Sequence, residues 1–254
     1  MRTAAPTPAR DATLALPLVY INLVEDTSRR AQFEAAFRAI GVTPERFDAV
    51  RWTRLSAAEQ AALYSEALNA GSYFRPLVGG EKGCYASHLA LWQRLLDAGD
   101  RAWVVLEDDV LPQPGLVDAV NAIAALPDGW DMVKLIGRER ERPLDRQRLR
   151  AGFDLITYRR VPSLTAGYVL SRSGAQKLLA LRPPFARPID VDLRMWWESG
   201  LVMRGLVPAV IALAPNEAQS SIGARRGAPS IGLRWRKFVF QWHYALANRR
   251  ARRP

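Results

Sequence analysis

Apolar residues along this chain fall into short continuous runs separated by segments with helical spacing. Residues 14–23 and 102–106 are two such runs, and their β-branched and aromatic residues favour strands buried in a sheet. After the first run, apolar residues recur every three or four positions between Ser28, which is placed to cap a helix, and Gly41, which is placed to end it. The chain is therefore predicted to begin with a strand, a turn and a helix.

A second helix is predicted over residues 55–70. Ser56 stands near its start and Glu59 follows three residues later, which is the spacing of a capping box. Gly71 then ends the helical pattern. This segment is therefore expected to be one continuous helix.

A third helix is predicted to begin at the glycine-rich residues 79–83. Cys84, His88 and Trp92 follow at intervals of four residues, so they share one helical face with apolar residues that point to the core. A histidine on such a face is usually hydrogen-bonded inside the core. We therefore favour that role for His88 over the roles of catalytic base or metal ligand.

The rest of the chain continues the alternation of strands and helices. Apolar runs predict three more strands, a charged loop follows the first of them, and a helix precedes the last. These segments are, in chain order, residues 131–136, 138–150, 161–170, 173–181 and 206–214. Strands alternating with helices predict an α/β protein.

The positive charge of the chain is concentrated near its C-terminus. The chain has 254 residues and a net charge of +11, but nine basic residues and no acidic residue lie after residue 217. Subtracting these nine charges from +11 leaves about +2 for the first 217 residues, which are nearly neutral. A nucleic-acid-binding domain spreads its charge over a folded face. The distribution therefore argues against nucleic acid as a partner.

Three sequence features bear on the cellular compartment. No run reaches the roughly 18 apolar residues of a membrane-spanning helix, and residues 1–10 lack the apolar core of a secretory signal. Cys84 is the only cysteine, which excludes an internal disulfide and a multi-cysteine metal site. We therefore expect a cytoplasmic protein.

Three adjacent acids, Glu107, Asp108 and Asp109, follow the apolar run at residues 102–106. Carboxylates this close repel one another at neutral pH unless a cation lies among them, and their hard oxygens favour magnesium or manganese. Because side chains alternate along a strand, we expect Glu107 and Asp109 on one face and Asp108 on the other. The end of a strand is where α/β sheets place their chemistry. The alternative is a solvated turn without function.

Five blocks of the sequence, these acids among them, resemble glycosyltransferase family 25. That family includes bacterial lipooligosaccharide galactosyl- and glucosyltransferases and the collagen galactosyltransferases. The resemblance spans about residues 18–222, and the second and third blocks together are specific, whereas any single block is weak. In chain order the blocks are Ile21-Asn22-Leu23 with Arg29-Arg30; Gly80-Glu81-Lys82-Gly83-Cys84 with Ser87-His88 and Trp92; Val105-Leu106-Glu107-Asp108-Asp109-Val110; Gly167-Tyr168-Val169-Leu170-Ser171 with Gly174-Ala175; and Pro188-Ile189-Asp190 with Gln219, Ser221 and Ile222.

The resemblance implies a single GT-A type domain, a Rossmann-like mixed sheet flanked by helices, over residues 14–222. It also implies inverting transfer of a hexose, galactose or glucose, from a UDP-sugar to a lipooligosaccharide or another glycan or lipid-linked acceptor, with a divalent metal, Mn2+ or Mg2+, as cofactor. The residues agree with this, since neither a Gly-x-Gly-x-x-Gly nor a Gly-x-x-x-x-Gly-Lys-Ser/Thr motif is present to hold a diphosphate. Glu107 or Asp109 would then ligate the metal that binds the diphosphate.

Donor binding is expected from residues near the first strand and the acids. Asn22 lies in the first matching block, Arg29 and Arg30 stand near a helix start that suits phosphates, and Asp108 is placed to bond a ribose or a loop amide. The alternative for the two arginines is ordinary solvated helix charge. Lys134, in an otherwise apolar run, either reaches the donor at the sheet edge or extends to solvent.

Inverting transfer needs a base for the acceptor hydroxyl, and Asp190 is our first candidate. It lies in a loop just after Pro188, and its alternative role is to cap the next helix. Glu81, among glycines, is the second candidate. Asp192, Trp196 and Trp197 are expected on the acceptor side, where the aromatic rings would stack a sugar.

Residues 223–254 are predicted to form a basic, aromatic tail. Five apolar residues share one helical face, and Arg234, Lys237 and Gln241 lie opposite; the apolar residues are Trp235, Phe238, Val239, Trp242 and Leu246. This pattern favours docking of residues 225–254 on an anionic membrane, each basic residue contributing about 1 kcal/mol. The enzyme would then lie on the inner face of the cytoplasmic membrane. The alternative is an ordinary helix packed on the domain.

Two other functional classes remain open from the sequence. The same acids would serve a metal-dependent phosphoesterase or nucleotidyltransferase, although the chain has only two histidines for a two-metal site. A non-catalytic module that binds membrane or nucleic acid through its tail would leave the acids a purely structural role.

Overall fold

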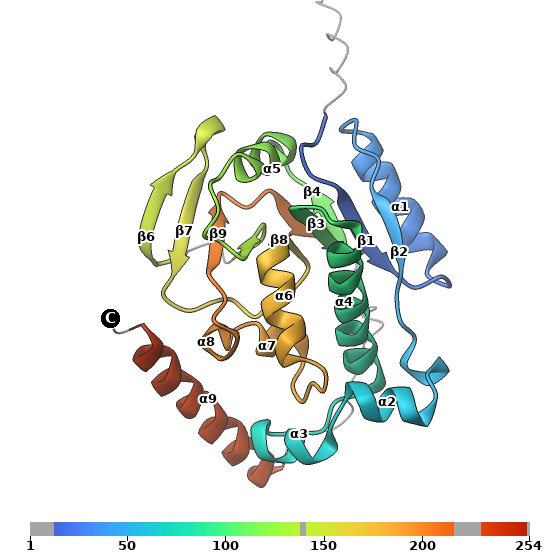
Figure 1. Cartoon of the computed structure of the whole chain (residues 1–254), viewed down its shortest axis with the longest axis vertical. Coiled ribbons are helices and arrows are strands. Elements are labelled where there is room, and N and C mark those ends of the chain that lie inside the picture. The colour runs from blue at the N-terminus through green and yellow to red at the C-terminus, as the bar shows by residue number, and fades with distance from the viewer. Residues whose placement is uncertain (1–12, 138–140, 216–229, 253–254) are drawn as a thin grey trace, which may run out of the picture.

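The computed structural model describes residues 13–137, 141–215 and 230–252 (Figure 1). These residues form a mixed α/β fold in which a central sheet is flanked by helices, as the sequence predicts and as a GT-A type fold requires. Within these ranges, no helix combines the length and the apolar character needed to cross a bilayer.

The described residues build one large mixed sheet and a small second one. The first three strands of the large sheet are parallel, whereas β8 runs antiparallel to both of its neighbours. The small sheet pairs β4 (Val110–Pro112) with β10 (Ile211–Leu213). In spatial order the large sheet contains β2 (Glu45–Asp48), β1 (Leu18–Asn22), β3 (Ala102–Glu107), β8 (Gly167–Ser171), β5 (Met132–Lys134), β9 (Met203–Val207), β7 (Asp154–Tyr158) and β6 (Pro143–Arg148).

Helices cover both faces of the large sheet. On one face lie α1 (Thr27–Arg38) and α5 (Leu116–Ala124), and on the other lie α4 (Gly79–Ala98) and α6 (Arg172–Leu181), which run side by side in front of the sheet in Figure 1. The remaining helices are η1 (Trp52–Arg54), α2 (Ala57–Leu63), α3 (Glu66–Ser72), η2 (Arg150–Gly152), α7 (Ile189–Asp192), α8 (Trp196–Ser199) and α9 (Ile231–Ala251).

The two faces of the sheet carry two separate hydrophobic cores. Along β3, Val104 and Leu106 join the core beneath α1 and α5, while Trp103 and Val105 join the core beneath α4 and α6. This is the alternation expected of a strand that is covered on both faces. Because β3 is buried on both sides, its end is held rigidly, and so is the acidic run that follows it.

Several predicted elements have different bounds in the structure. The helix predicted over residues 55–70 is two helices, because Tyr64 leaves the helix to bridge Phe185 and Ser65 starts α3 with its own cap. The capping box of Ser56 and Glu59 is present at α2. The cap predicted at Ser28 is wrong, because α1 begins at Thr27 and its N-cap residue makes no side-chain cap bond.

Two predicted strands and the predicted charged loop, all after residue 137, also differ in the structure. The run 161–170 is a strand only from Gly167, and the run 206–214 is divided between β9 and β10, which belong to different sheets. The predicted charged loop contains β6, an exposed edge strand that pairs with β7. Polar edge strands lack the apolar run by which a buried strand is recognised.

Candidate active site

The acidic run lies where β3 ends and the chain turns into β4. Glu107 is the last residue of β3, and Asp108 and Asp109 form the turn. Burial, with smaller contributions from Glu107 and Asp108, raises the pKa of Asp109 to about 7. Burial also raises the pKa of Asp108. Asp108 and Asp109 are thus held in a partly desolvated place, where burial and the neighbouring carboxylates both oppose their charge.

A first cavity, of about 260 Å3, opens beside the acids at the ends of β1 and β3. The first cavity is bounded by the start of α4 and by the segment that joins β2 to η1. Its lining includes Asn22, Arg29, Trp52, Gly80, Cys84, His88, Glu107, Asp108 and Asp109. Gly83 allows the close approach of α4, because a Cβ there would lie 2.7 Å from the carbonyl oxygen of Val50.

A second cavity, also of about 260 Å3, lies on the other side of the acids. Its lining includes Glu81, Cys84, Glu107, Asp109, Ser163, Thr165 and Asp190. Cys84, Glu107 and Asp109 line both cavities, whereas Asp108 lines only the first. Glu107 and Asp109 therefore form a wall shared by the two cavities, the acid wall, whereas Asp108 lines the first cavity alone.

The shared wall suits a hard divalent cation. The Oδ1 atom of Asp109 is buried and has no hydrogen-bond partner among the described residues, which is costly for a carboxylate oxygen. Glu107 keeps about a quarter of its side chain exposed and lines the same cavities. A cation between these two carboxylates would remove both the repulsion and the unsatisfied oxygen, so the residues present fit Mn2+ or Mg2+.

The predicted donor-binding residues divide into two groups. Asn22 donates to Asp108 (2.6 Å) and Arg29 pairs with the same carboxylate (3.2 Å), so these three residues form one polar cluster on the first cavity. Arg30 instead pairs with Glu34 along α1 and does not line either cavity. Its placement favours the alternative role, an ordinary helix charge.

Lys134 is completely buried and lines neither cavity. Its ammonium donates to the carbonyl oxygen of Pro162 (2.8 Å), so the alternative in which it extends to solvent is wrong. Burial lowers its pKa to about 7, against the opposing attraction of Asp190. Burial raises the pKa of Asp190, and Lys134 partly offsets that shift. The two groups therefore act on each other electrostatically beside the acid wall.

The two candidate bases differ in how they are held. Asp190 lines the second cavity from the first turn of α7, a short helix where a loop was predicted. Glu81 also lines this cavity, but both of its oxygens accept from Arg75 (2.6 and 2.8 Å) and one accepts from the Val78 amide. A carboxylate held by a bidentate arginine is a weak proton acceptor. The geometry therefore favours Asp190.

The residues expected on the acceptor side lie away from both cavities. Asp192 is buried among Arg182, Arg187 and the Tyr85 hydroxyl, and all three donate to it. Trp196 donates to Asn248 of α9 (3.3 Å). None of these side chains reaches the second cavity. Their contacts indicate that they hold α7 and α8 against the rest of the domain.

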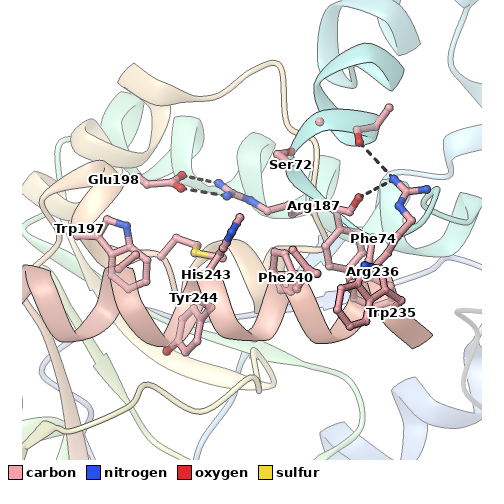
Figure 2. Close-up of a pocket in the computed structure, with 16 residues that line it drawn as sticks. Ser72, Phe74, Arg187, Trp197, Glu198, Trp235, Arg236, Phe240, His243 and Tyr244 are labelled. Atoms are coloured by element: carbon pink, nitrogen blue, oxygen red, sulfur yellow. Dashed lines mark hydrogen bonds and ion pairs between the residues drawn. The ribbon is translucent and has the colours of Figure 1, made fainter. Parts of the chain in front are cut away.

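Trp197 faces a groove of about 470 Å3 between α9, α8 and the end of α3. Figure 2 shows this groove, with the Arg187–Glu198 pair on one side and the aromatic residues of α9 on the other. Tyr244 of α9 lies against Trp197, with ring centroids 5.5 Å apart, and Phe240 lies against Tyr73. One side of α9 is thus packed on the domain. Trp235, Phe238 and Trp242 remain more than half exposed.

Comparison with known proteins agrees with the motif blocks. The sequence profile of glycosyltransferase family 25 (LPS biosynthesis protein) matches residues 16–128. Proteins named glycosyltransferase 25 family member from Anopheles gambiae and Drosophila pseudoobscura pseudoobscura are 30% and 31% identical over 70% and 68% of this chain. Procollagen galactosyltransferase 1 from Danio rerio is 30% identical over 64% of it. This chain belongs to glycosyltransferase family 25.

The chain is much shorter than these family 25 relatives. The matches cover 31%, 28% and 28% of the length of the three proteins. The likeness therefore extends over less than a third of each relative.

Within this family 25 chain, the matching blocks converge in space. The first three blocks supply Asn22, Cys84 and the acid wall of the first cavity. The fourth block is β8, which pairs with β3, and a Cβ at its Gly167 would lie 2.1 Å from the side chain of Ile211 and 2.8 Å from that of Leu106. The fifth block supplies Asp190, but its Gln219, Ser221 and Ile222 lie outside the described residues.

Sequence reasoning missed two parts of this site. Trp52 lines the first cavity from the segment after β2, a strand that the sequence pattern did not reveal because it is short and half-exposed. Thr165 lines the second cavity, and its buried hydroxyl has no partner among the described residues. A strand-end position would have pointed to Trp52 only if β2 had been recognised. No sequence signal singles out Thr165.

Proposed function

We propose that this chain is a metal-dependent inverting hexosyltransferase that moves galactose or glucose from a UDP-sugar to a lipooligosaccharide or another glycan. The observation that carries the proposal is the acid wall, because Glu107 and Asp109 line two cavities of similar volume at once. A donor in one cavity and an acceptor in the other would meet at this wall. The association of the family with LPS biosynthesis, and the name procollagen galactosyltransferase 1 of one relative, support the substrate class.

The first cavity is assigned to the donor. Asp108 is held by Asn22 and Arg29, and this polar cluster is suited to a ribose and to phosphate oxygens. Trp52 offers an aromatic surface to the uracil ring. Glu107 and Asp109 would hold the divalent cation, which when bound neutralises the charge that develops on the departing diphosphate.

The second cavity is assigned to the acceptor. Asp190 lies in it and takes the proton from the attacking hydroxyl, so that the new bond forms on the face of the sugar opposite the leaving diphosphate. Burial raises the pKa of Asp190, which strengthens it as a base, while Lys134 keeps it ionised often enough to act. Glu81, tied to Arg75, orients the start of α4 in this assignment and is the second candidate for the base.

A donor screen tests the proposal directly. The protein is incubated with Mn2+, a truncated lipooligosaccharide acceptor and UDP-galactose, UDP-glucose or a UDP-N-acetylhexosamine, and products are followed by mass spectrometry, with the anomeric configuration read by NMR. We expect transfer of one hexose with inversion, and its loss in Asp109→Ala. Equal activity of Asp109→Ala and the parent would make the metal-site proposal wrong, and turnover of phosphoesters without sugar transfer would replace it with a phosphoesterase.

We also propose that α9 docks the enzyme on an anionic membrane that carries a lipid-linked acceptor, which would place it on the inner face of the cytoplasmic membrane. Trp235, Phe238 and Trp242 of α9 are exposed by 57–65%, although Trp235 also borders the groove between α9 and the domain. The basic residues Arg225, Arg226 and Arg253 of the predicted tail lie outside the described residues.

Vesicle flotation tests the docking of α9. Replacement of the three exposed aromatic residues by serine is expected to abolish binding to vesicles that contain anionic lipid, because both burial of aromatic rings and proximity of the basic residues are lost. Leu144→Ser, at an exposed apolar residue of β6, is the matched control and should still float. Flotation of the triple variant at the parent level would exclude α9 as the membrane contact.

A further inference from the structure

Three side chains of different chemistry converge at the inner edge of the acid wall. Cys84 and His88 lie one helical turn apart on α4, and Glu107 comes from the end of β3. One potential ligand atom from each residue, a sulfur, a nitrogen and an oxygen, lies within 4.8 Å of the other two. Ligands of a tetrahedral zinc ion are about 3.5 Å apart, so small side-chain movements would bring all three within bonding distance.

His88 has a nitrogen that nothing in the described structure satisfies. The side chain is 1% exposed, and its Nε2 atom has no hydrogen-bond partner within the described ranges. The Oε1 atom of Glu107 is 3.5 Å away, in a geometry that makes no hydrogen bond. With a hydrogen on Nε2 the donor is unsatisfied, and without one the lone pair is unsatisfied. A buried unsatisfied nitrogen that points into a cluster of ligand atoms indicates an absent ligand.

The other nitrogen of His88 is held in the manner of a metal ligand. Its Nδ1 lies 2.7 Å from the Tyr168 hydroxyl, and that oxygen also accepts a hydrogen bond from Trp92 (2.8 Å). Metal-binding histidines are normally fixed through their second nitrogen, which orients the ring and directs the first toward the ion. Tyr168 and Trp92 therefore aim Nε2 at the cluster.

We propose that Cys84, His88 and Glu107 form a second metal site, selective for a thiophilic divalent cation of the zinc type. A thiolate and an imidazole select zinc over magnesium or manganese, so this site differs in chemistry from the site of Glu107 and Asp109. Three protein ligands leave the fourth position open to the first cavity, which Cys84, His88 and Glu107 all line. Burial raises the pKa of the Cys84 thiol, so the cation must displace a proton when it binds.

The site has a functional consequence that rests on the proposed function. Glu107 belongs to both metal sites, so zinc bound by Cys84 and His88 would draw this carboxylate away from the cation of the donor. Zinc would then inhibit sugar transfer in competition with manganese. Removal of zinc with a chelator, followed by renewed addition of Mn2+, is expected to restore transfer, because the metal–ligand bonds form reversibly.

Cobalt is the probe for the test, because a cobalt–thiolate bond gives a near-ultraviolet charge-transfer absorption that oxygen and nitrogen ligands do not give. Cys84 is the only cysteine, so such a band can arise from no other residue. We expect the full chain to bind one equivalent of Co2+ with this band, and stoichiometric Zn2+ to abolish it. A parent protein without the band at saturating Co2+ overturns the proposal and leaves water as the ligand of His88.

Matched variants identify the ligands. Cys84→Ser should remove the band, and His88→Gln should weaken Co2+ binding by at least about tenfold, as even loss of a supporting partner of a ligand does. His243→Gln, at the only other histidine, should bind as the parent does. Thermal unfolding of each variant establishes that it is folded. Equal affinity of folded His88→Gln and His243→Gln contradicts the proposal.

Asp109→Asn separates this site from the proposed function. It should lose manganese-dependent transfer yet keep the cobalt–thiolate band, because Asp109 is not part of the cluster. In Cys84→Ser, zinc inhibition relative to the variant's own uninhibited rate should fall by at least about tenfold. If the parent protein transfers sugar but shows no cobalt–thiolate band, only the second metal site is contradicted. If it shows the band but transfers no sugar, only the proposed function is contradicted.

Discussion

Two groups of acidic residues lie close to the same sheet, and they differ in how far basic residues compensate their charge. Glu107, Asp108 and Asp109 have one arginine between them, and Asp109 keeps an oxygen without a partner among the described residues. Asp192 and Glu198 are bound by Arg182 and Arg187, and Asp192 also accepts from Tyr85. Removal of a fully paired, buried carboxylate leaves its cationic partners uncompensated, whereas crowded carboxylates with an unsatisfied oxygen are the sign of a site that needs a ligand.

The largest expected effect concerns the unpaired group. Asp109→Asn should lower the rate of sugar transfer by about 10²- to 10³-fold, the loss typical of one electrostatic contact to the transition state. Its thermal unfolding temperature should stay the same or rise, because the change removes like-charge repulsion. Initial rates with Mn2+ and the preferred donor, together with thermal unfolding, measure both. A rate within threefold of the parent rate, a change of about 0.6 kcal/mol in activation free energy, would contradict this difference between the two groups of acids.

The paired group should show the reverse. Asp192→Asn leaves Arg182 and Arg187 with less compensating charge in a buried place, so the free energy of unfolding should fall by about 3 kcal/mol. Urea unfolding measures the loss, and transfer per folded molecule should remain near the parent rate at low temperature. A variant of unchanged stability that has lost transfer would instead return Asp192 to the acceptor side, as the sequence first suggested.

Lys134 offers a pH test of the same region. Its pKa of about 7 in the fold lies below its ordinary value of 10.5, so between these values the unfolded chain binds a proton that the folded chain does not. Stability from this group therefore rises with pH from about 7 to 10.5 and is flat below 7. Lys134→Met should be more stable by about 3 kcal/mol at pH 7, after loss of the bond to Pro162.

The measurement for Lys134 is the difference in unfolding free energy between the variant and the parent as a function of pH. That difference should shrink as pH rises from 7 toward 10, because the parent no longer bears the cost of protonating a buried amine. A difference that does not change with pH would show that Lys134 stays charged in the fold.

The smallest effect is expected from the polar cluster of the first cavity. Asp108→Asn keeps a partner for Asn22 but loses the ion pair with Arg29, so the affinity for UDP should fall by about tenfold, or about 1.4 kcal/mol. Isothermal titration calorimetry measures this affinity. Arg30→Gln is the control, because Arg30 pairs with Glu34 and should leave UDP binding unchanged.

Local patterns predicted the elements that hold the site. The apolar run before Glu107 indicated a buried strand, and the face of α4 that carries Cys84 and His88 followed from helical spacing. These predictions depend only on neighbours in the chain, so they could be made without a structure. The tail helix was predicted in the same way, although only one side of it proved to be free of the domain.

The partners of the site residues could not be predicted in this way. Asp190 and Asp192 stand two residues apart and share the same local sequence, yet one lines a cavity and the other is buried with two arginines. Which of the two acids is paired depends on where the preceding segment places Arg182 and Arg187. The spacing of residues along the chain cannot predict that placement, because the placement arises from packing between distant segments.

The sequence by itself thus determined that three acids follow a buried strand and that a cysteine and a histidine share a helical face. Only the tertiary structure decided that the helix and the strand meet, so that Cys84, His88 and Glu107 lie within 4.8 Å and the acids form a wall between two cavities. The physical reason is that backbone periodicity sets the direction of each side chain, while close packing of the two cores sets which side chains face one another.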